Sequence, residues 1–184
     1  FLKAAELEQQ GWARAPLNRW EKAGAQAVPL YEGKMVQMFD HRAADVVLNV
    51  GNLKRAAQQE ALSQVEKASP ERYPAPQYWV MEEGVRPTWE GEWCIAYKSV
   101  TAPSNMRTMI AAIVPQCGVG NSMAMLLPKP GHEDSYPRWA ALLLANLSSM
   151  AFDFALRQKV QGQNLNWFIV EQAAVIAPER FNEP

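Results

Sequence analysis

The stretch WCIAYKSVTAPSNMRTMIAAIVP, residues 93–115, decides the fold because two strand-like runs enclose one polar segment. Trp93, Ile95 and Tyr97 belong to the first run, and the apolar residues 109–115 form the second. Aromatic and β-branched residues of this kind favour β-strands. The segment between the runs is rich in cationic and hydrogen-bonding side chains, namely Lys98, Ser99, Thr101, Ser104, Asn105, Arg107 and Thr108.

Further strand candidates lie at 28–31, 78–80 and 122–128. The tail differs from them. After Pro137 more than twenty residues follow without Gly or Pro, with apolar groups at helical spacing, and this pattern predicts one long helix ending at about Lys159. Residues 166–178 fit either a short helix or a strand.

The remaining segments are less apolar. Residues 1–27 suit a short helix or lead-in rather than a strand, and residues 49–76 suit a surface excursion with one exposed helix over 53–67. The sequence therefore predicts an α+β fold: a curled, mostly antiparallel β portion at about 28–127, followed by a helical portion at about 137–178. Together they make one domain over 28–178, and 179–184 form a tail.

Composition and charge narrow the class of protein. The 184 residues are 48% hydrophobic, which suffices for one core. The formal charge of −1 provides no overall attraction to nucleic acid or to an anionic membrane, so any anion site must be local. Two cysteines without CxxC spacing favour a reduced, cytoplasmic protein, and the apolar stretches fall short of a membrane span. Because the chain begins without Met, we expect a piece of a longer protein.

Motifs for independent catalysis are missing from the sequence. It contains no GxSxG, P-loop or GxGxxG in a suitable setting, and its two histidines lack metal-ligand spacing. Glu32 and Lys34 match half of a metal-dependent nuclease motif, with Asp40 or Asp45 as a second carboxylate, but such a site requires these groups to converge on a metal. His41 with Arg42 forms a polar exit from an apolar run. We expect no catalytic, cofactor or metal site in this chain.

The polar segment 98–108 is the best site candidate. Lys98 and Arg107 offer charge-assisted donors and the neighbouring side chains offer short neutral ones, a set that suits phosphates and base edges. A purely structural role remains open, because Pro103 begins a good turn and Arg107 has Glu90 or Glu92 as possible ion-pair partners.

Four phrases occur in order: VPLYEGKMVQMFDHR (28–42), YWV with WCIAYKSVTAPSNMRTMIAAIVP, the link CGVGNS (117–122), and LLLANLSSMAFDFALRQKVQGQNLNWFIVEQAAVIAP (142–178). Together they resemble the C-terminal target-recognition region of large restriction-modification DNA adenine-N6 methyltransferases, the TaqI-like specificity domain. The resemblance implies a β-helix-like sheet with a C-terminal helical hairpin. It also implies an upstream methyltransferase domain of the same chain, which would bind S-adenosylmethionine and carry the catalytic motifs.

The resemblance further implies a role in reading double-stranded DNA for a type II enzyme of phage defence, while the catalytic domain flips the target base. The residues it makes first candidates for DNA contact are Lys34, Arg42, Lys98, Ser104, Asn105, Arg107 and Thr108. Weaker candidates are Tyr31, Asn164 and Asn166. If the recognisable phrases are scaffold, base contacts fall to loops that carry Lys54, Arg55, Arg72 and Arg86.

Two other classes stay open. A metal-dependent nuclease requires Glu32, Lys34 and an aspartate to cluster in space. A protein-interaction or assembly module requires a large exposed apolar patch, with the predicted helix around 139–156 as the place to find it.

Overall fold

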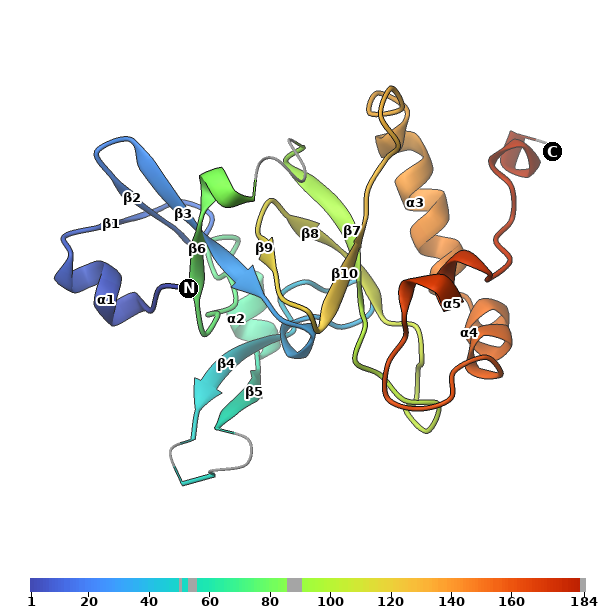
Figure 1. Cartoon of the computed structure of the whole chain (residues 1–184), viewed down its shortest axis with the longest axis horizontal. Coiled ribbons are helices and arrows are strands. Elements are labelled where there is room, and N and C mark those ends of the chain that lie inside the picture. The colour runs from blue at the N-terminus through green and yellow to red at the C-terminus, as the bar shows by residue number, and fades with distance from the viewer. Residues whose placement is uncertain (50, 53–55, 86–90, 183–184) are drawn as a thin grey trace.

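The computed structural model describes the chain except for residues 50, 53–55, 86–90 and 183–184 (Figure 1). Helices and largely antiparallel sheets confirm the predicted α+β class. An N-terminal sheet lies at one end of the molecule, a three-stranded sheet lies in the middle, and the C-terminal helices lie at the other end (Figure 1). These helices are α3 (Tyr136–Leu147), α4 (Met150–Arg157) and α5 (Trp167–Glu171).

The N-terminal sheet has the strand order β1-β2-β3-β6, with β9 parallel to β3. Its strands are β1 (Ala13–Ala15), β2 (Arg19–Lys22), β3 (Ala25–Tyr31), β6 (Trp79–Met81) and β9 (Gly118–Val119). Gly118 is required here, because a Cβ at this position would lie 2.5 Å from Val80 Cγ2 across the sheet.

The expectation that residues 1–27 contain no strand is wrong. Helix α1 (Ala4–Gln9) confirms the short helix, but β1, β2 and the beginning of β3 also lie in this region. Leu7 joins Trp20 and Trp79 in one buried cluster, in which the two indole rings meet edge to face at 6.1 Å. The strand around Trp20 pairs with β1 and β3, but its buried side chain packs on Trp79, some sixty residues away, so local spacing could not reveal why Trp20 is buried.

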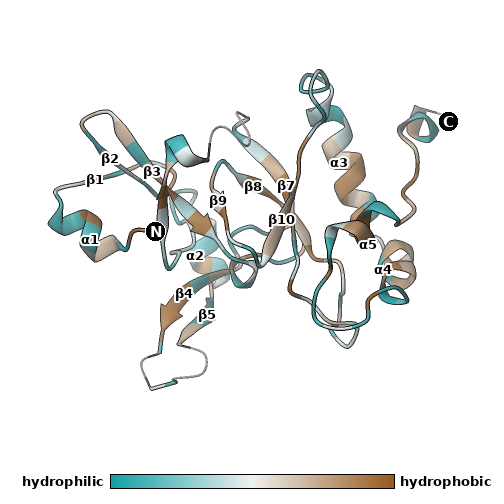
Figure 2. Cartoon of the chain, viewed as in Figure 1, coloured by the Kyte–Doolittle hydropathy of each residue, from teal (hydrophilic) through white to brown (hydrophobic). Residues whose placement is uncertain are grey.

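The middle sheet places β7 (Trp93–Lys98) between β8 (Ala111–Pro115) and β10 (Met123–Leu126), both antiparallel to it. The strands predicted from the opening stretch and from 122–128 are therefore confirmed. The main core extends from this sheet to α3, which is predominantly hydrophobic (Figure 2). The Tyr136 hydroxyl at the start of α3 accepts a hydrogen bond from the Ile95 N–H (2.8 Å) and donates one to the Leu126 carbonyl (2.7 Å), which fixes the helix on the sheet.

A separate hairpin consists of β4 (Ala44–Leu48) and β5 (Ala57–Ala61). It follows the short 3₁₀ turn η1 (Gly33–Met35) and precedes helix α2 (Gln64–Ala68). The exposed helix predicted over 53–67 is thus wrong for residues 57–61, because pairing with β4 overrides the helix propensity of the Ala-Gln-Glu sequence, whereas residues 64–67 do belong to helix α2. Residues 53–55 lie outside the described part of the chain.

The single long helix predicted after Pro137 is broken into α3 and α4, which are bent by 63°. Ser149 Oγ accepts a hydrogen bond from the Phe152 N–H (3.1 Å) and so starts α4, while the carbonyl of Ser148 accepts one from Arg107. Among the described helices, none is by itself long and apolar enough to cross a membrane; only the bent pair taken together reaches that length and composition.

The segment left ambiguous between helix and strand contains the short helix α5, and the last described residues form the 3₁₀ turn η3 (Pro178–Asn182). The 3₁₀ turn η2 (Glu82–Gly84), which follows β6, completes the described elements. Leu165, just before α5, is fully buried in the main core, so the chain after α4 returns to the middle sheet.

Candidate nucleic-acid interface

The loop between β7 and β8, residues 99–110, is held in place by α4. Asp153 Oδ1 accepts hydrogen bonds from the N–H groups of Thr108 and Met109, both at 2.8 Å. Arg157 donates to the carbonyls of Pro103 (2.9 Å) and Met106 (3.0 Å) and forms an ion pair with Asp153 at 2.8 Å. Much of the polar character of this loop therefore serves its attachment to a helix, and we call this arrangement the α4 clamp.

The clamp controls the protonation of its carboxylate. Burial of Asp153 opposes its ionisation, but the Met109 and Thr108 N–H groups and the Arg157 guanidinium outweigh burial and lower the pKa of this carboxyl. Asp153 is therefore a charged group inside the protein, balanced by three donors.

Three of the predicted DNA contacts belong to the same loop and make internal contacts. Arg107 donates to the Ser148 carbonyl at the end of α3 and approaches Met150 Sδ (3.3 Å), instead of pairing with Glu92; Glu90 lies outside the described residues. The Asn105 amide donates to Thr101 Oγ1 (3.3 Å), and Thr108 is fully buried. In this conformation the Thr108 side chain does not reach the surface.

Two further predicted cations bind backbone carbonyls. Arg42 donates to the carbonyls of Lys67 and Ser69 (both 2.9 Å), which are exposed by the end of α2, and to that of Arg72 (3.3 Å). Lys34 donates to the Ala57 carbonyl in β5 (3.1 Å) and pairs with Glu32 (3.1 Å). Both residues thereby attach neighbouring segments to the hairpin region.

Lys98 and Ser104 differ from the other five predicted residues. Within the described part of the chain, no hydrogen bond or ion pair of either side chain is found. Ser104 is exposed at the tip of the loop, next to the almost fully exposed Met106. Lys98 is half-buried at the end of β7, and burial lowers the pKa of its ammonium group. An anion at this position would restore the stability of the charged form.

Hydrogen bonds connect four segments around Lys98. The Gly33 N–H donates to Ser122 Oγ (2.9 Å), and the Ser99 N–H donates to the Ser122 carbonyl (3.0 Å). The Leu165 N–H donates to the Ser99 carbonyl (2.7 Å), and the Thr101 N–H to that of Gln163 (3.0 Å). A Cβ at Gly33 would lie 3.6 Å from Lys98 Cγ. We call these segments, residues 32–34, 98–108, 121–122 and 161–166, the loop face.

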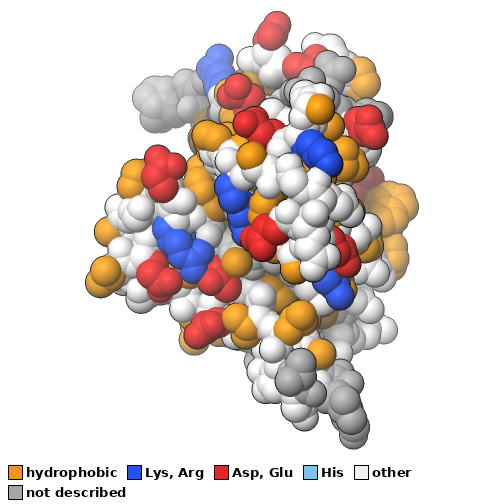
Figure 3. All heavy atoms as spheres, turned by 90° about the vertical axis from the view of Figure 1, so that its left-hand side faces the viewer, with side chains coloured by type: hydrophobic (Ala, Val, Ile, Leu, Met, Phe, Trp, Pro, Cys, Tyr) orange, Lys and Arg blue, Asp and Glu red, His pale blue; other side chains and the backbone are white. Residues whose placement is uncertain are grey.

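The loop face has a defined position in the molecule. The loop after β7, the loop before α5 and the strands of the β4–β5 hairpin project from the same lower side of the molecule (Figure 1). By contrast, the end of the molecule that carries the N-terminal sheet shows Lys and Arg interspersed with Asp and Glu (Figure 3). A phosphate backbone would meet mixed charge on that end, whereas Lys98 stands without a described counter-charge on the loop face.

The carboxylates of the nuclease alternative do not converge. Asp40 pairs with Lys67 and Asp45 pairs with Arg72, each at 2.6 Å, while Glu32 pairs with Lys34. No group of three or more His, Cys, Asp or Glu side chains that could hold a metal ion is found within the described ranges.

The weaker candidates are also placed. Burial lowers the pKa of His41, which lies between Tyr31 and Tyr73 with ring centroids 6.4 Å apart on each side. Tyr31 itself is buried. Arg72 is engaged by Asp45 and Glu66. Lys54, Arg55 and Arg86 lie outside the described residues, and Asn164 and Asn166 belong to the loop-face segment that precedes α5.

Sequence reasoning missed Asp153 and Arg157, the two residues that organise the loop. Their signal was present, since an acid and a base four residues apart interact along a helix, and Asp153 interrupts an otherwise apolar run.

Comparison of the chain with protein-family models, with curated proteins and with solved structures yields no match. The function therefore has to be argued from the loop face itself.

Proposed function

We propose that this chain is a DNA-recognition domain of a restriction-modification adenine methyltransferase. In this proposal it binds double-stranded DNA in the cytoplasm and positions it for an upstream methyltransferase domain of the same chain. That domain supplies S-adenosylmethionine and the catalytic residues, so this chain performs no catalysis of its own. The sequence resemblance supplies the family part of the proposal.

One observation carries the DNA-binding part. Lys98 lies where four polar loop segments meet, half-buried and without a described anionic partner, on a side from which two loops and the β4–β5 hairpin project. A phosphate oxygen there would form a charge-assisted hydrogen bond, and the exposed Ser104 hydroxyl could approach the same strand. Lys34 and Arg107 support the face by attaching two of its segments to β5 and to the end of α3.

Salt-titrated binding of a random duplex pool tests the proposal. We expect Lys98→Ala to weaken binding and to reduce the slope of log affinity against log salt by about one, because one phosphate contact is lost. Lys129→Ala is the matched control, since Lys129 is an exposed lysine in the loop before α3, on the opposite side of the molecule (Figure 1). Equal salt slopes for both variants would contradict the placement of DNA on the loop face.

A second function is favoured by exposed apolar side chains in the helical region. Met150 and Phe154 are 77% and 70% exposed on one face of α4, and Trp167 is 64% exposed on α5. Side chains of this size suit a protein interface. If duplex binding is absent even at low salt, a concentration-dependent change in mass by light scattering that Phe154→Ser abolishes would support an assembly role instead.

A further inference from the structure

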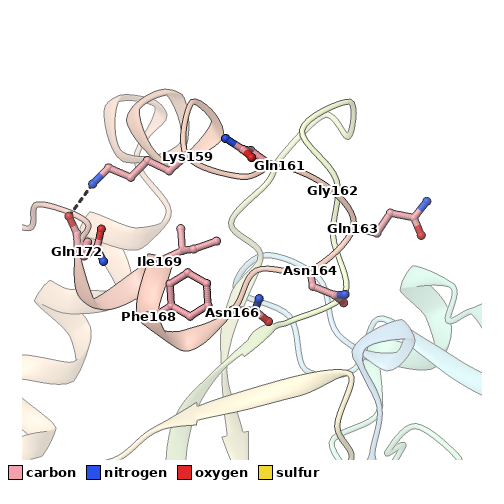
Figure 4. Close-up of a pocket in the computed structure, with 9 residues that line it drawn as sticks. All are labelled: Lys159, Gln161, Gly162, Gln163, Asn164, Asn166, Phe168, Ile169 and Gln172. Atoms are coloured by element: carbon pink, nitrogen blue, oxygen red, sulfur yellow. Dashed lines mark hydrogen bonds between the residues drawn. The ribbon is translucent and has the colours of Figure 1, made fainter.

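The segment that follows α4 curls into a pocket. Lys159, two residues after α4, donates from its ammonium group to the Gln172 carbonyl after α5, at 2.9 Å (Figure 4). The pocket is open to solvent and has a volume of about 550 Å³, within the range of about 300 to 1,000 Å³ that small-molecule sites occupy. All nine lining residues come from this one segment, 159–172.

The lining is rich in uncommitted amides. Its five amide side chains make no hydrogen bond within the described part of the chain; they are Gln161, Gln163, Asn164, Asn166 and Gln172. Phe168, which is 48% exposed, contributes an aromatic ring beside Ile169 (Figure 4). Lys159 is the one charged residue of the lining, and its ammonium group already binds a carbonyl.

The amide side chains and the aromatic ring of the lining indicate which class of ligand the pocket can bind. A lining of amides offers both donors and acceptors but no free charge, so it suits a neutral group that carries both kinds of hydrogen-bonding atom. An exposed ring beside the amides suits a flat face that can stack on it. A nucleobase has both properties, and Asn and Gln side chains are suited to base edges.

The location of the pocket favours a base of DNA over a free sugar. The Gln163 carbonyl accepts a hydrogen bond from the Thr101 N–H, and the Leu165 N–H donates to Ser99, so the pocket wall is continuous with the loop face. We propose that this pocket holds one unstacked nucleobase of a DNA strand bound to the loop face. The inference rests on the proposed function and adds to it a site for a base outside the helical stack.

The test compares two duplexes with the whole chain. One is fully paired, and the other has the same sequence with a single bulged 2-aminopurine. We expect the bulged duplex to bind about tenfold more tightly, because stacking on an aromatic side chain is of that size. We also expect the 2-aminopurine fluorescence to change on binding. Phe168→Ala should remove both effects and retain the affinity for the paired duplex, whereas Phe168→Leu, which keeps an apolar group, should retain part of the gain.

Phe154→Ala is the matched control, because Phe154 is an exposed aromatic residue on α4 outside the pocket lining. Circular dichroism with thermal melting verifies that each variant is folded. A gain for the bulged duplex that Phe168→Ala retains would overturn the inference, and so would equal binding of the two duplexes. Both results leave DNA binding intact, while failure to bind the paired duplex would contradict the proposed function itself. Binding of a neutral oligosaccharide that Phe168→Ala abolishes, without any response to the bulge, would assign the pocket to sugars and overturn the inference.

Discussion

The loop between β7 and β8 and the hairpin of β4 and β5 project from the same side of the molecule, but they are stabilised differently. The hairpin has its own ladder of five residue pairs, and ion pairs such as Asp45 with Arg72 are added at its side. The loop has no such ladder over 101–108, and charged side chains of α4 bind its backbone instead. In the hairpin, charged side chains thus add to a β ladder that is already present. In the loop, they take the place of a ladder by binding the backbone directly.

The largest expected effect follows from removing the clamp. Asp153→Ala leaves two buried N–H groups without their acceptor and the Arg157 guanidinium without its ion-pair partner, so we expect a loss of about 3 kcal/mol in the free energy of unfolding. Asp45→Ala, the matching change beside the hairpin, should cost about 1 kcal/mol because the ladder remains. Urea denaturation of both variants measures the difference, and equal losses would break the comparison.

The clamp also predicts a pH dependence. Because the folded-state pKa of Asp153 is below its usual value of 3.8, the unfolded chain binds the proton first as the pH falls. Its stabilisation is therefore present above about pH 4 and is lost as the pH falls through the folded-state pKa. We expect the stability difference between the wild type and Asp153→Asn to be constant between pH 7 and 5 and to shrink below about pH 4. A difference that grows on acidification would exclude an ionised Asp153.

A smaller effect is expected where η1 meets the turn before β10. A Cβ at Gly33 would lie 2.8 Å from the Ser122 carbonyl oxygen, so Gly33→Ala forces two backbone segments of the loop face apart. We expect a cost of about 1 to 2 kcal/mol, as for other overpacked sites. At Gly84 a Cβ would meet nothing within 4 Å, and Gly84→Ala is the control. Thermal melting of the two variants tests the close approach, which would be refuted by equal melting temperatures.

The smallest expected effect compares two N-terminal serine caps. Ser149 caps α4 through the Phe152 N–H, and Ser63 caps α2 through the Glu66 N–H. Ser149→Ala should cost about 1 kcal/mol, because α4 carries the clamp, whereas Ser63→Ala should cost only a few tenths on the exposed α2. Hydrogen exchange of the Thr108 and Met109 amides should accelerate in Ser149→Ala and stay unchanged in Ser63→Ala. Unchanged exchange of the Thr108 and Met109 amides in Ser149→Ala would show that the cap and the loop are independent.

Local sequence chemistry predicted what depends on neighbouring residues. The strands β7, β8 and β10 were found from their aromatic and β-branched runs, and the helical region from its apolar spacing. The strands β2 and β5 were missed although each pairs with a neighbouring segment in a hairpin, because their polar sequences lack the aromatic and β-branched runs that identify a strand. The break at Ser148 and Ser149 was missed because apolar spacing continues through it, although two adjacent serines are a reasonable signal for a cap.

The candidate site shows a similar division. The sequence identified the polar segment after β7, but it could not separate side chains that face outward from those that bind the protein itself. Arg42 and Arg107 have the charge expected of DNA contacts, and both bind carbonyls near the ends of helices. Lys98 became the strongest candidate only when its neighbours were known, and DNA contact by any of these residues remains a prediction.

The α4 clamp has a consequence for how this protein can change. Asp153 and Arg157 bind only main-chain atoms of the loop, at Pro103, Met106, Thr108 and Met109. Main-chain atoms are the same whichever side chains stand beside them, so residues 104–106 can be exchanged while the loop keeps its path. Selection, or a combinatorial library at these three positions, can therefore search for new binding preferences without first having to preserve the fold.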